Sequence, residues 1–195
     1  MATYKSIRYN TPLSNGGSQV LLSEVTASSD STISFTSGID STYKEYLITF
    51  INVHPATDNV KLTFQANAAG ESGFNETITS AMFRAQLDEG DSDSNLLYNA
   101  AADQAQGTAF QQLCDNGIGN GNDESMSGYL SLFNLADTTF VKHFMGRNNM
   151  YQKDDYTNDN FLTGYFNTTS AIDEIQFKMS SGNIDAGTFK LYGVN

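Results

Sequence analysis

The stretch IDEIQFKMSSGNIDAGTFKLYGV, residues 172–194, decides the fold class of this chain. Residues 174–179 alternate between polar and apolar side chains, which is the period-two pattern of a strand with one buried face. Residues 188–192 repeat the alternation, and the link 180–187 is rich in Ser, Gly, Asn and Asp. The stretch therefore predicts a closing β-hairpin. A hairpin is not stable alone in water, so the remaining chain must supply sheets for it to pack against.

Composition places the chain among folded all-β proteins. A chain of 195 residues is long enough for one sizeable core. With 39% hydrophobic, 12% aromatic and only 16% charged residues, the sequence is unlike a disordered chain. Tyr, Phe, Thr, Ser, Asn and Gly dominate and only two Pro occur, which is typical of strands joined by turns. We expect a single β-sandwich domain over residues 20–195, preceded by an N-terminal arm over residues 1–19.

The charge and the cysteine content narrow the function classes. The net charge of −12, with only ten Lys and Arg, argues against nucleic-acid binding, because each phosphate contact needs a cation. An anionic membrane would repel the chain too. No apolar run reaches the length of a membrane span, and the first residues lack the apolar core of a signal peptide, so we expect a soluble protein made in a cytoplasm. The single cysteine, Cys114, excludes an internal disulfide and is expected to be a small, semi-buried residue.

Strand patterns recur along the chain. Residues 43–53 are apolar on both faces, which predicts a central strand covered on each side. Residues 60–65 alternate strictly and predict a half-exposed strand. Residues 77–87 fit either a strand carrying Ile78 and Phe83 or a short helix, and the neighbouring strands favour a strand. Further strands are expected at residues 20–25, 33–35, 126–135, 139–145 and 161–167.

The middle of the chain is acidic and irregular. Residues 85–141 contain nine acidic residues and no Lys or Arg, a composition typical of long loops on the outer surface. Residues 99–112 are rich in Ala and Gln and are expected to hold a helical turn, whereas residues 153–160 are expected to form a polar loop. The count of eight to ten strands fits an all-β fold. We expect a two-sheet antiparallel sandwich, jelly-roll-like, with long acidic loops and an extended N-terminal arm.

The sequence contains no recognisable catalytic motif. Neither His54 nor His143 belongs to a His-Glu-x-x-His pattern, and there is no Gly-x-Ser-x-Gly, no cysteine pair and no Gly-rich phosphate loop. Adjacent carboxylates on one strand point to opposite faces, so no glycosidase pair can be read from sequence. We expect no enzyme activity and no cofactor.

Two weaker ligand patterns remain open. Residues 91–95 have the spacing of the first ligands of a calcium loop, but Leu96 stands where the sharp turn requires Gly, which leaves only a loose surface calcium site. Sugar-binding sites use flat aromatic platforms, although packing in the core is the ordinary role of aromatic residues. The candidate platform residues are Tyr129, Tyr151, Tyr156 and Tyr165.

Three stretches resemble a known group of proteins. Residues 23–36, 39–57 and 186–193 (SEVTASSDSTISFT, IDSTYKEYLITFINVHPAT and AGTFKLYG) are similar to structural proteins of tailed bacteriophages, especially marine and cyanobacterial ones. Proteins of this group occur on virions as tail-fibre-type or head-decorating β-sandwiches. The resemblance lies at the two ends of the chain and leaves the acidic region 85–125 unmatched.

The resemblance implies a non-enzymatic structural component of the virion, made in the host cytoplasm, that decorates or stabilises the capsid or forms a short appendage. Its partners would be other virion proteins of the capsid or tail. Exposed strand edges and the symmetry axes of virions favour a homo-oligomer, with a trimer preferred. The alternative is a receptor- or glycan-binding module of a tail fibre or tail tip, and a polysaccharide-degrading enzyme is a third possibility.

The N-terminal arm differs in charge from the rest of the chain. Residues 1–19 carry two cations and no acid, so residues 20–195 hold a net charge of −14, two below the −12 of the whole chain. The arm also carries apolar side chains to bury on a partner, and it ends in the flexible joint Asn15-Gly16-Gly17. We expect the arm to anchor the subunit to the particle or to a neighbouring subunit, the alternative being an edge strand folded back on its own sheet. The predicted partner-binding residues are Tyr4, Lys5, Ile7, Arg8 and Tyr9.

Overall fold

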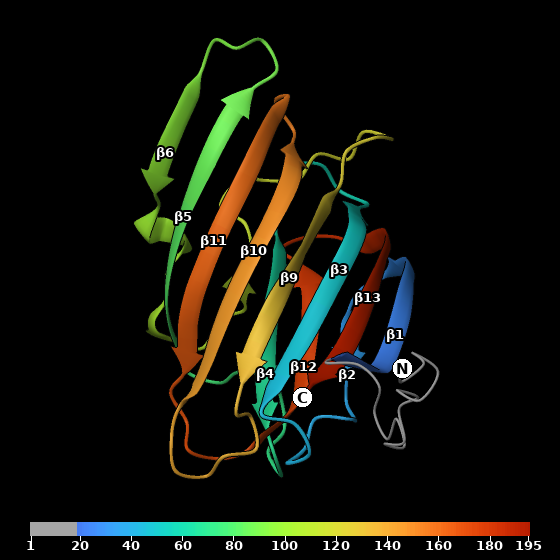
Figure 1. The fold of residues 1–195 in the computed structure, drawn as a ribbon. Helices are drawn as coiled ribbons and strands as arrows, with labels where there is room; N and C mark the ends of the chain where they lie inside the picture. The colour runs from blue at the N-terminus through green and yellow to red at the C-terminus, as the bar shows by residue number, and fades with distance from the viewer. Residues whose placement is uncertain (1–18) are drawn as a thin grey trace, which may run out of the picture.

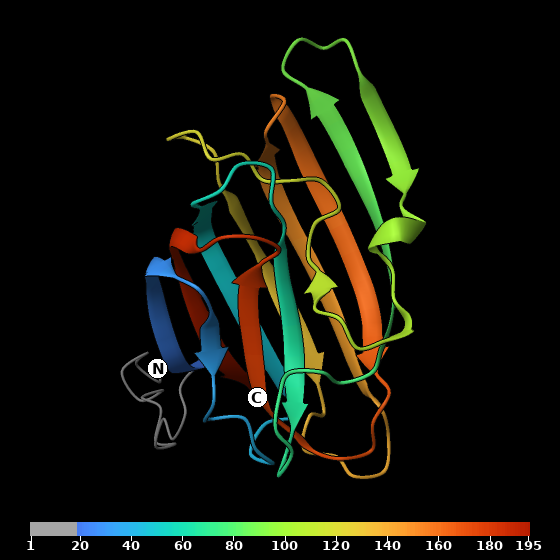
Figure 2. The same ribbon diagram turned by 180° about the vertical axis from the view of Figure 1, so that it is seen from behind.

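The computed structural model describes residues 19–195, which form two antiparallel β-sheets packed face to face (Figures 1 and 2). The nine-stranded large sheet has the order β1 (Gln19–Asp30), β13 (Ile184–Val194), β3 (Glu45–Pro55), β9 (Met126–Phe133), β10 (Lys142–Gln152), β11 (Tyr156–Phe166), β5 (Ile78–Asp88) and β6 (Ser94–Tyr98), with β7 (Ala105–Gly107) also paired to β5. The four-stranded small sheet has the order β2 (Ile33–Phe35), β12 (Ile172–Met179), β4 (Leu62–Ala68) and β8 (Gln111–Gln112).

These sheets confirm the all-β, two-sheet antiparallel sandwich, whereas the narrower jelly-roll description stays a prediction. The described residues begin at Gln19, the first residue of β1. The predicted partner-binding residues of the arm, Tyr4, Lys5, Ile7, Arg8 and Tyr9, therefore lie outside the described residues. Within residues 19–195 no helix is long and apolar enough to cross a membrane.

The predicted C-terminal hairpin is wrong, because its two strands belong to different sheets. β12 pairs with β2 and β4, and β13 pairs with β1 and β3. The link Ser180–Asn183 crosses from one sheet to the other. The amide of Ser180 donates to the Lys61 carbonyl at 2.8 Å, and the Asn183 carbonyl accepts from the Ala56 amide at 3.0 Å. An alternating pattern sets which face of a strand is buried, but it does not set which strand pairs with it.

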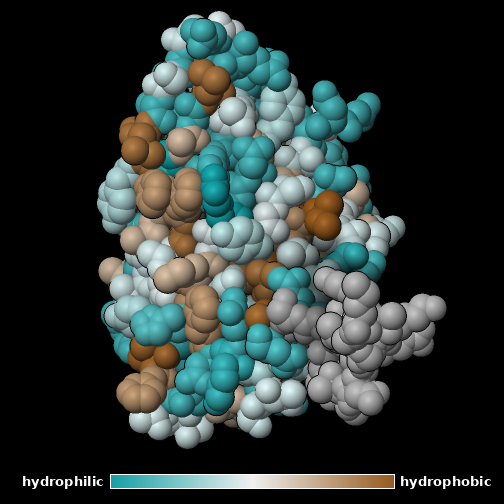
Figure 3. Space-filling model, in the orientation of Figure 1, coloured by the Kyte–Doolittle hydropathy of each residue, from teal (hydrophilic) through white to brown (hydrophobic). Residues whose placement is uncertain are grey.

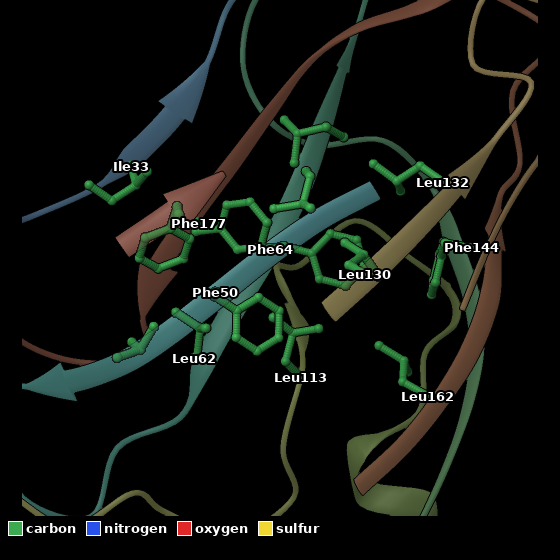
Figure 4. Close-up of a cluster of buried hydrophobic side chains, with 14 of the residues drawn as sticks. Ile33, Phe50, Leu62, Phe64, Leu113, Leu130, Leu132, Phe144, Leu162 and Phe177 are labelled. Atoms are coloured by element: carbon green, nitrogen blue, oxygen red, sulfur yellow. The ribbon is translucent and has the colours of Figure 1, made fainter. Parts of the chain in front are cut away.

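The crossing brings aromatic side chains of both sheets together in one core. Phe177 of β12 and Phe189 of β13 meet with their ring centroids 5.3 Å apart. Phe64 of β4 packs edge-on against Phe144 at 5.2 Å and Phe166 at 6.2 Å, both from the large sheet. Figure 4 shows this cluster, in which the labelled side chains come from both sheets. The aromatic contacts thus tie the small sheet to the centre of the large one.

The structure corrects two further predictions of strand burial. β3 is a central strand, as predicted, but only one of its faces is covered, since Ile51 on the outer face is 45% exposed. β4 is buried along its whole length rather than half-exposed. Its outward Gln65 lies under neighbouring chain and donates from Nε2 to the carbonyls of Glu76, Thr108 and Ala109 at 3.0 to 3.2 Å.

The polar loop expected at residues 153–160 is mostly strand. β10 and β11 form a long hairpin whose turn comprises only Lys153, Asp154 and Asp155, and Tyr156–Asn160 already belongs to β11. In the middle of the chain, the expected strand at residues 77–87 is confirmed as β5. The helical turn expected within residues 99–112 is confirmed as a 3₁₀ helix, Ala100–Ala102.

The central position of Phe64 leads to a stability prediction. Replacing Phe64 with Ala should lower the free energy of unfolding by about 3–5 kcal/mol, because a fully buried ring in contact with three other rings would leave a cavity. Urea denaturation measures the effect. Phe140→Ala is the matched control, since Phe140 is 66% exposed and its loss should change stability by less than about 0.5 kcal/mol. Equal effects of the two substitutions would contradict this account of the core.

Candidate functional site

The outer face of the large sheet carries a continuous row of aromatic side chains, which we call the aromatic strip. The strand register places Tyr98 of β6 beside Phe83 of β5, and Phe83 beside Phe161 of β11. Phe161 is in turn paired with Arg147 of β10, and Arg147 with Tyr129 of β9. Directly paired residues on one face of a sheet lie about 5 Å apart, so these five side chains form one row across five strands.

The members of the aromatic strip hold one another in place. The rings of Phe83 and Phe161 are stacked with centroids 4.7 Å apart and an angle of 4° between their planes. The Arg147 guanidinium lies 4.7 Å from the centroid of the Phe161 ring. The hydroxyl of Tyr98 at the end of the row donates to the Asp103 carboxylate, which raises the pKa of Tyr98.

The charge of Arg147 is balanced within the site. Its Nε and Nη2 donate to the two carboxylate oxygens of Asp159 at 3.0 and 2.7 Å, and this hydrogen-bonded pairing raises the pKa of Arg147. A bidentate pair of this kind fixes the orientation of both side chains. The aromatic strip is therefore close to neutral in a chain that is otherwise strongly acidic.

The aromatic strip is exposed to solvent. Tyr98 is 64% exposed, and Phe83 and Tyr129 are each 43% exposed, while Met145 beside them is 56% exposed. These side chains line a hollow of about 470 Å³ on the sheet. Figure 3 views the outer face, where apolar side chains gather over β5, β11 and β10. Exposed apolar side chains gathered on one face make the aromatic strip a candidate interaction site.

A polar groove adjoins the aromatic strip and shares two of its members, Tyr129 and Arg147. The groove has a volume of about 540 Å³. Within it, the side-chain amide of Asn149 donates to the hydroxyl of Thr157 at 2.7 Å. The face thus combines an apolar half with a polar half. The other residues that line the groove are Ser127, Gly128, Asn148, Asn149, Thr157 and Asp159.

Behind the aromatic strip the inner face of the sheet carries a buried polar row. On one side of the strip, the sequence neighbours of Phe83, Phe161 and Arg147 are the buried residues Arg84, Asn160 and Asn148. On the other side they include the buried apolar residues Met82 and Leu162. Asn160 donates from Nδ2 to Asn148 Oδ1 at 3.0 Å. The three polar residues are paired across β5, β11 and β10, so a polar row runs directly under the aromatic one.

The buried polar row holds a segment of loop against the inner face. Asn148 donates from Nδ2 to the Leu113 carbonyl at 2.6 Å. The Arg84 guanidinium forms an ion pair with Asp115, whose side chain is fully buried, and Asn99 donates to the same carboxylate at 3.1 Å. Among residues 19–195 no strand of the small sheet covers this part of the large sheet, and Figure 2 shows the loop running over it instead.

The structure separates the four tyrosines that were candidates for a sugar platform. Tyr129 lies in the aromatic strip. The hydroxyls of Tyr151 and Tyr156 donate to Asp155 and Asp93, each at 3.2 Å, near the turns that join β10 to β11 and β5 to β6. Tyr165 lies on the same face but outside the strip, with its ring centroid 6.0 Å from that of His143. None of the four is buried in the core, so the packing role expected for them is wrong.

Reasoning from the sequence missed the other members of the aromatic strip. Phe83 and Ile78 were expected on one strand, and they lie on opposite faces of β5, with Ile78 fully buried and Phe83 outside. The spacing of Ile78 and Phe83 does indicate this, since positions five residues apart in a strand face opposite ways. Phe161 begins an expected strand, but the polar residues 156–160 before it, which predict a loop, conceal the alternation that sets its face.

The structure of residues 19–195 gives little support for a metal site, a calcium loop or a reactive cysteine. No group of three or more His, Cys, Asp or Glu side chains in this part of the chain is arranged to hold a metal ion. In the loop considered for calcium, the Asp88 carboxylate accepts from the amides of Ser92 and Asp93, each at 2.7 Å. Cys114 is fully buried rather than semi-buried, and burial raises the pKa of its thiol to about 12.

Comparison with known proteins gives no family assignment: no protein-family model matches the sequence, and no curated protein matches it.

The buried ion pair behind the aromatic strip leads to a second prediction. Asp115→Asn should lower the free energy of unfolding by about 3–5 kcal/mol, because it leaves the Arg84 charge buried without a carboxylate. Urea denaturation of the single variant and of the double variant Arg84→Met/Asp115→Leu tests the cause. The double variant should be more stable than the single one, since it leaves no buried charge. A double variant that is less stable than the single one would show that the ion pair itself supplies the stability.

Proposed function

We propose that this chain is a non-enzymatic structural component of a bacteriophage virion that binds other virion proteins through the aromatic strip. The observation that supports binding is the composition and exposure of the strip. Tyr, Phe, Met and Arg are enriched in protein–protein interfaces, while Lys and Glu are depleted there. Tyr and Arg are also the residues whose loss most often weakens such interfaces. Every member of the strip, together with Met145, belongs to this set.

The assignment to a virion rests on the resemblance of residues 23–36, 39–57 and 186–193 to structural proteins of tailed bacteriophages. In that setting the subunit would decorate or stabilise the capsid or form a short appendage. The net charge of −12 disfavours contact with the packaged genome, which supports an orientation with the acidic turns toward the outside of the particle. A homo-oligomer, with a trimer preferred, suits both the symmetry axes of a virion and a sandwich with free strand edges.

The polar groove beside Tyr129 favours a second candidate function, which is glycan recognition at a tail tip. An exposed tyrosine ring next to amide, hydroxyl and guanidinium groups is a combination that binds sugars. The apolar half is less suited to a sugar. The facing sides of the Phe83 and Phe161 rings are covered by each other, and Arg147 lies over Phe161, so ring edges rather than open faces point outward. Protein docking is therefore the better use of the strip as a whole.

Incorporation into particles tests the proposal. Virions assembled with the variant Phe83→Ser should contain at least about tenfold less of the chain than wild-type virions, because an interface hot spot is removed. Quantitative mass spectrometry of purified virions measures the content. Phe140→Ser is the matched control, since Phe140 is exposed outside the aromatic strip.

The possible results separate the two functions. Wild-type content for Phe83→Ser, or absence of the wild-type chain from virions, would refute docking through the strip. Loss of signal on a glycan array for Tyr129→Ala, with normal incorporation, would establish the second candidate instead.

A further inference from the structure

Two Asn-Gly pairs lie in the segment that leads into β9, at Asn116-Gly117 and Asn120-Gly121. In such a pair the backbone nitrogen of the glycine can attack the side-chain amide carbon of the asparagine, because glycine has no side chain to hinder the approach. The cyclic imide that forms is then hydrolysed to aspartate or isoaspartate. An Asn-Gly pair is therefore a candidate site of spontaneous deamidation, and its surroundings decide whether the reaction occurs.

The surroundings of Asn120-Gly121 favour the reaction. Asn120 is exposed, and Figure 1 shows this segment projecting from the sandwich near the end of β3. The backbone amide of Gly121 donates to Oε2 of Glu124. This carboxylate thus touches the nitrogen that must lose its proton in order to attack, which is where a general base has to lie. The Gly121 carbonyl accepts from the Glu124 amide and from His54 Nε2, each at 3.0 Å, so the turn is held in place.

The surroundings of Asn116-Gly117 oppose the same reaction. The side-chain amide of Asn116 donates to Oδ1 of the fully buried Asn158 at 3.2 Å. Gly117 is itself buried, and a Cβ atom built on it would lie only 2.6 Å from the backbone carbonyl carbon of Asn59. To form the imide, Asn116 would have to break its hydrogen bond and move the chain against this close contact. The two pairs therefore differ in their surroundings and not in their chemistry.

We propose that Asn120 is a spontaneous deamidation site at which Glu124 acts as the general base. The Gly121 nitrogen bonds to Cγ of Asn120 while its proton passes to the Glu124 carboxylate. The bond between Cγ and Nδ2 then breaks, and Nδ2 leaves as ammonia with the proton that Glu124 returns. One water molecule adds to the imide and opens it to aspartate or isoaspartate. The reaction consumes only that water and requires no oxidant, reductant or cofactor.

The product adds a carboxylate to a hollow that is already acidic. This hollow has a volume of about 500 Å³, and His54, Asp123, Glu124 and Asp185 are among its lining residues. Each modified copy carries a net charge of −13, one below the −12 of the unmodified chain. The charge of this surface therefore changes with the age of the protein, and ion-exchange chromatography can separate the modified copies.

Peptide mapping by mass spectrometry, during incubation of the full-length protein at neutral pH, tests the proposal. In the folded protein we expect Asn120 to be converted at least about tenfold faster than Asn116. In concentrated urea the two rates should become similar, because unfolding removes the surroundings that distinguish the two pairs. Glu124→Gln keeps an oxygen that can accept from the Gly121 amide but cannot take its proton. This variant should convert Asn120 at least about tenfold more slowly than the wild type.

Asp123→Asn is the matched control, because it removes the same charge from the adjacent exposed residue and leaves the contact of Glu124 with Gly121 in place. It should convert Asn120 at the wild-type rate. Equal slowing by the two substitutions would overturn the proposal, since local charge rather than proton transfer would then set the rate. Conversion of Asn120 at the wild-type rate in Glu124→Gln would overturn it too. A preference for Asn120 that persists in urea would do the same, because the fold would not be its cause.

Discussion

The aromatic contact between the two sheets is the interaction on which the remaining structure depends. Phe177 of β12 and Phe189 of β13 are separated by only eleven intervening residues, yet they enter the core from opposite sheets and meet at 5.3 Å. Phe64 extends this contact to Phe144 on β10. Because the chain crosses between the sheets at residues 180–183, its last strand joins the large sheet, between β1 and β3, rather than the small one.

The unequal size of the two sheets explains the placement of the aromatic strip. Four strands cannot cover nine, so part of the large sheet must be closed by loop. A loop brings backbone carbonyls and amides that need hydrogen-bond partners when buried. Asn148 and Arg84 supply such partners on the inner face, toward Leu113 and Asp115. The outer positions of the same strands are then left for the apolar side chains, which form a row on regular strands.

Much of the fold was predictable from the sequence, because alternation and turn composition are local signals. They established the all-β class, the absence of long helices and most strand positions. Pairing partners were not predictable, since a period-two pattern is the same in a hairpin and in a crossing between sheets. The polarity of Asn158 and Asn160 predicts a loop, although both residues are fully buried in a strand. Their side chains are paired with partners from other parts of the sequence: Asn160 donates to Asn148 Oδ1 and accepts from the Asp115 amide, and Asn158 accepts from the Asn116 side chain.

The candidate site was largely hidden for the same reason. Tyr129 is recognisable from the sequence as an aromatic candidate. For Phe83 and Phe161 the sequence predicts strands, but it does not determine on which face of the sheet their side chains lie. Only the register across β5, β11 and β10 reveals that they stack with Arg147 in one row. The buried polar row of Arg84, Asn160 and Asn148 likewise becomes visible only when the strands are paired.

The central claim is that the aromatic strip is covered in the assembled particle. Hydroxyl-radical footprinting of intact virions, compared with the free protein, tests this most directly at Tyr129 and Met145, with Phe140 as an exposed reference outside the strip. The account predicts strong protection of Tyr129 and Met145 in the particle, with oxidation of Phe140 unchanged. Equal oxidation of Tyr129 and Met145 in the free and assembled states would contradict it.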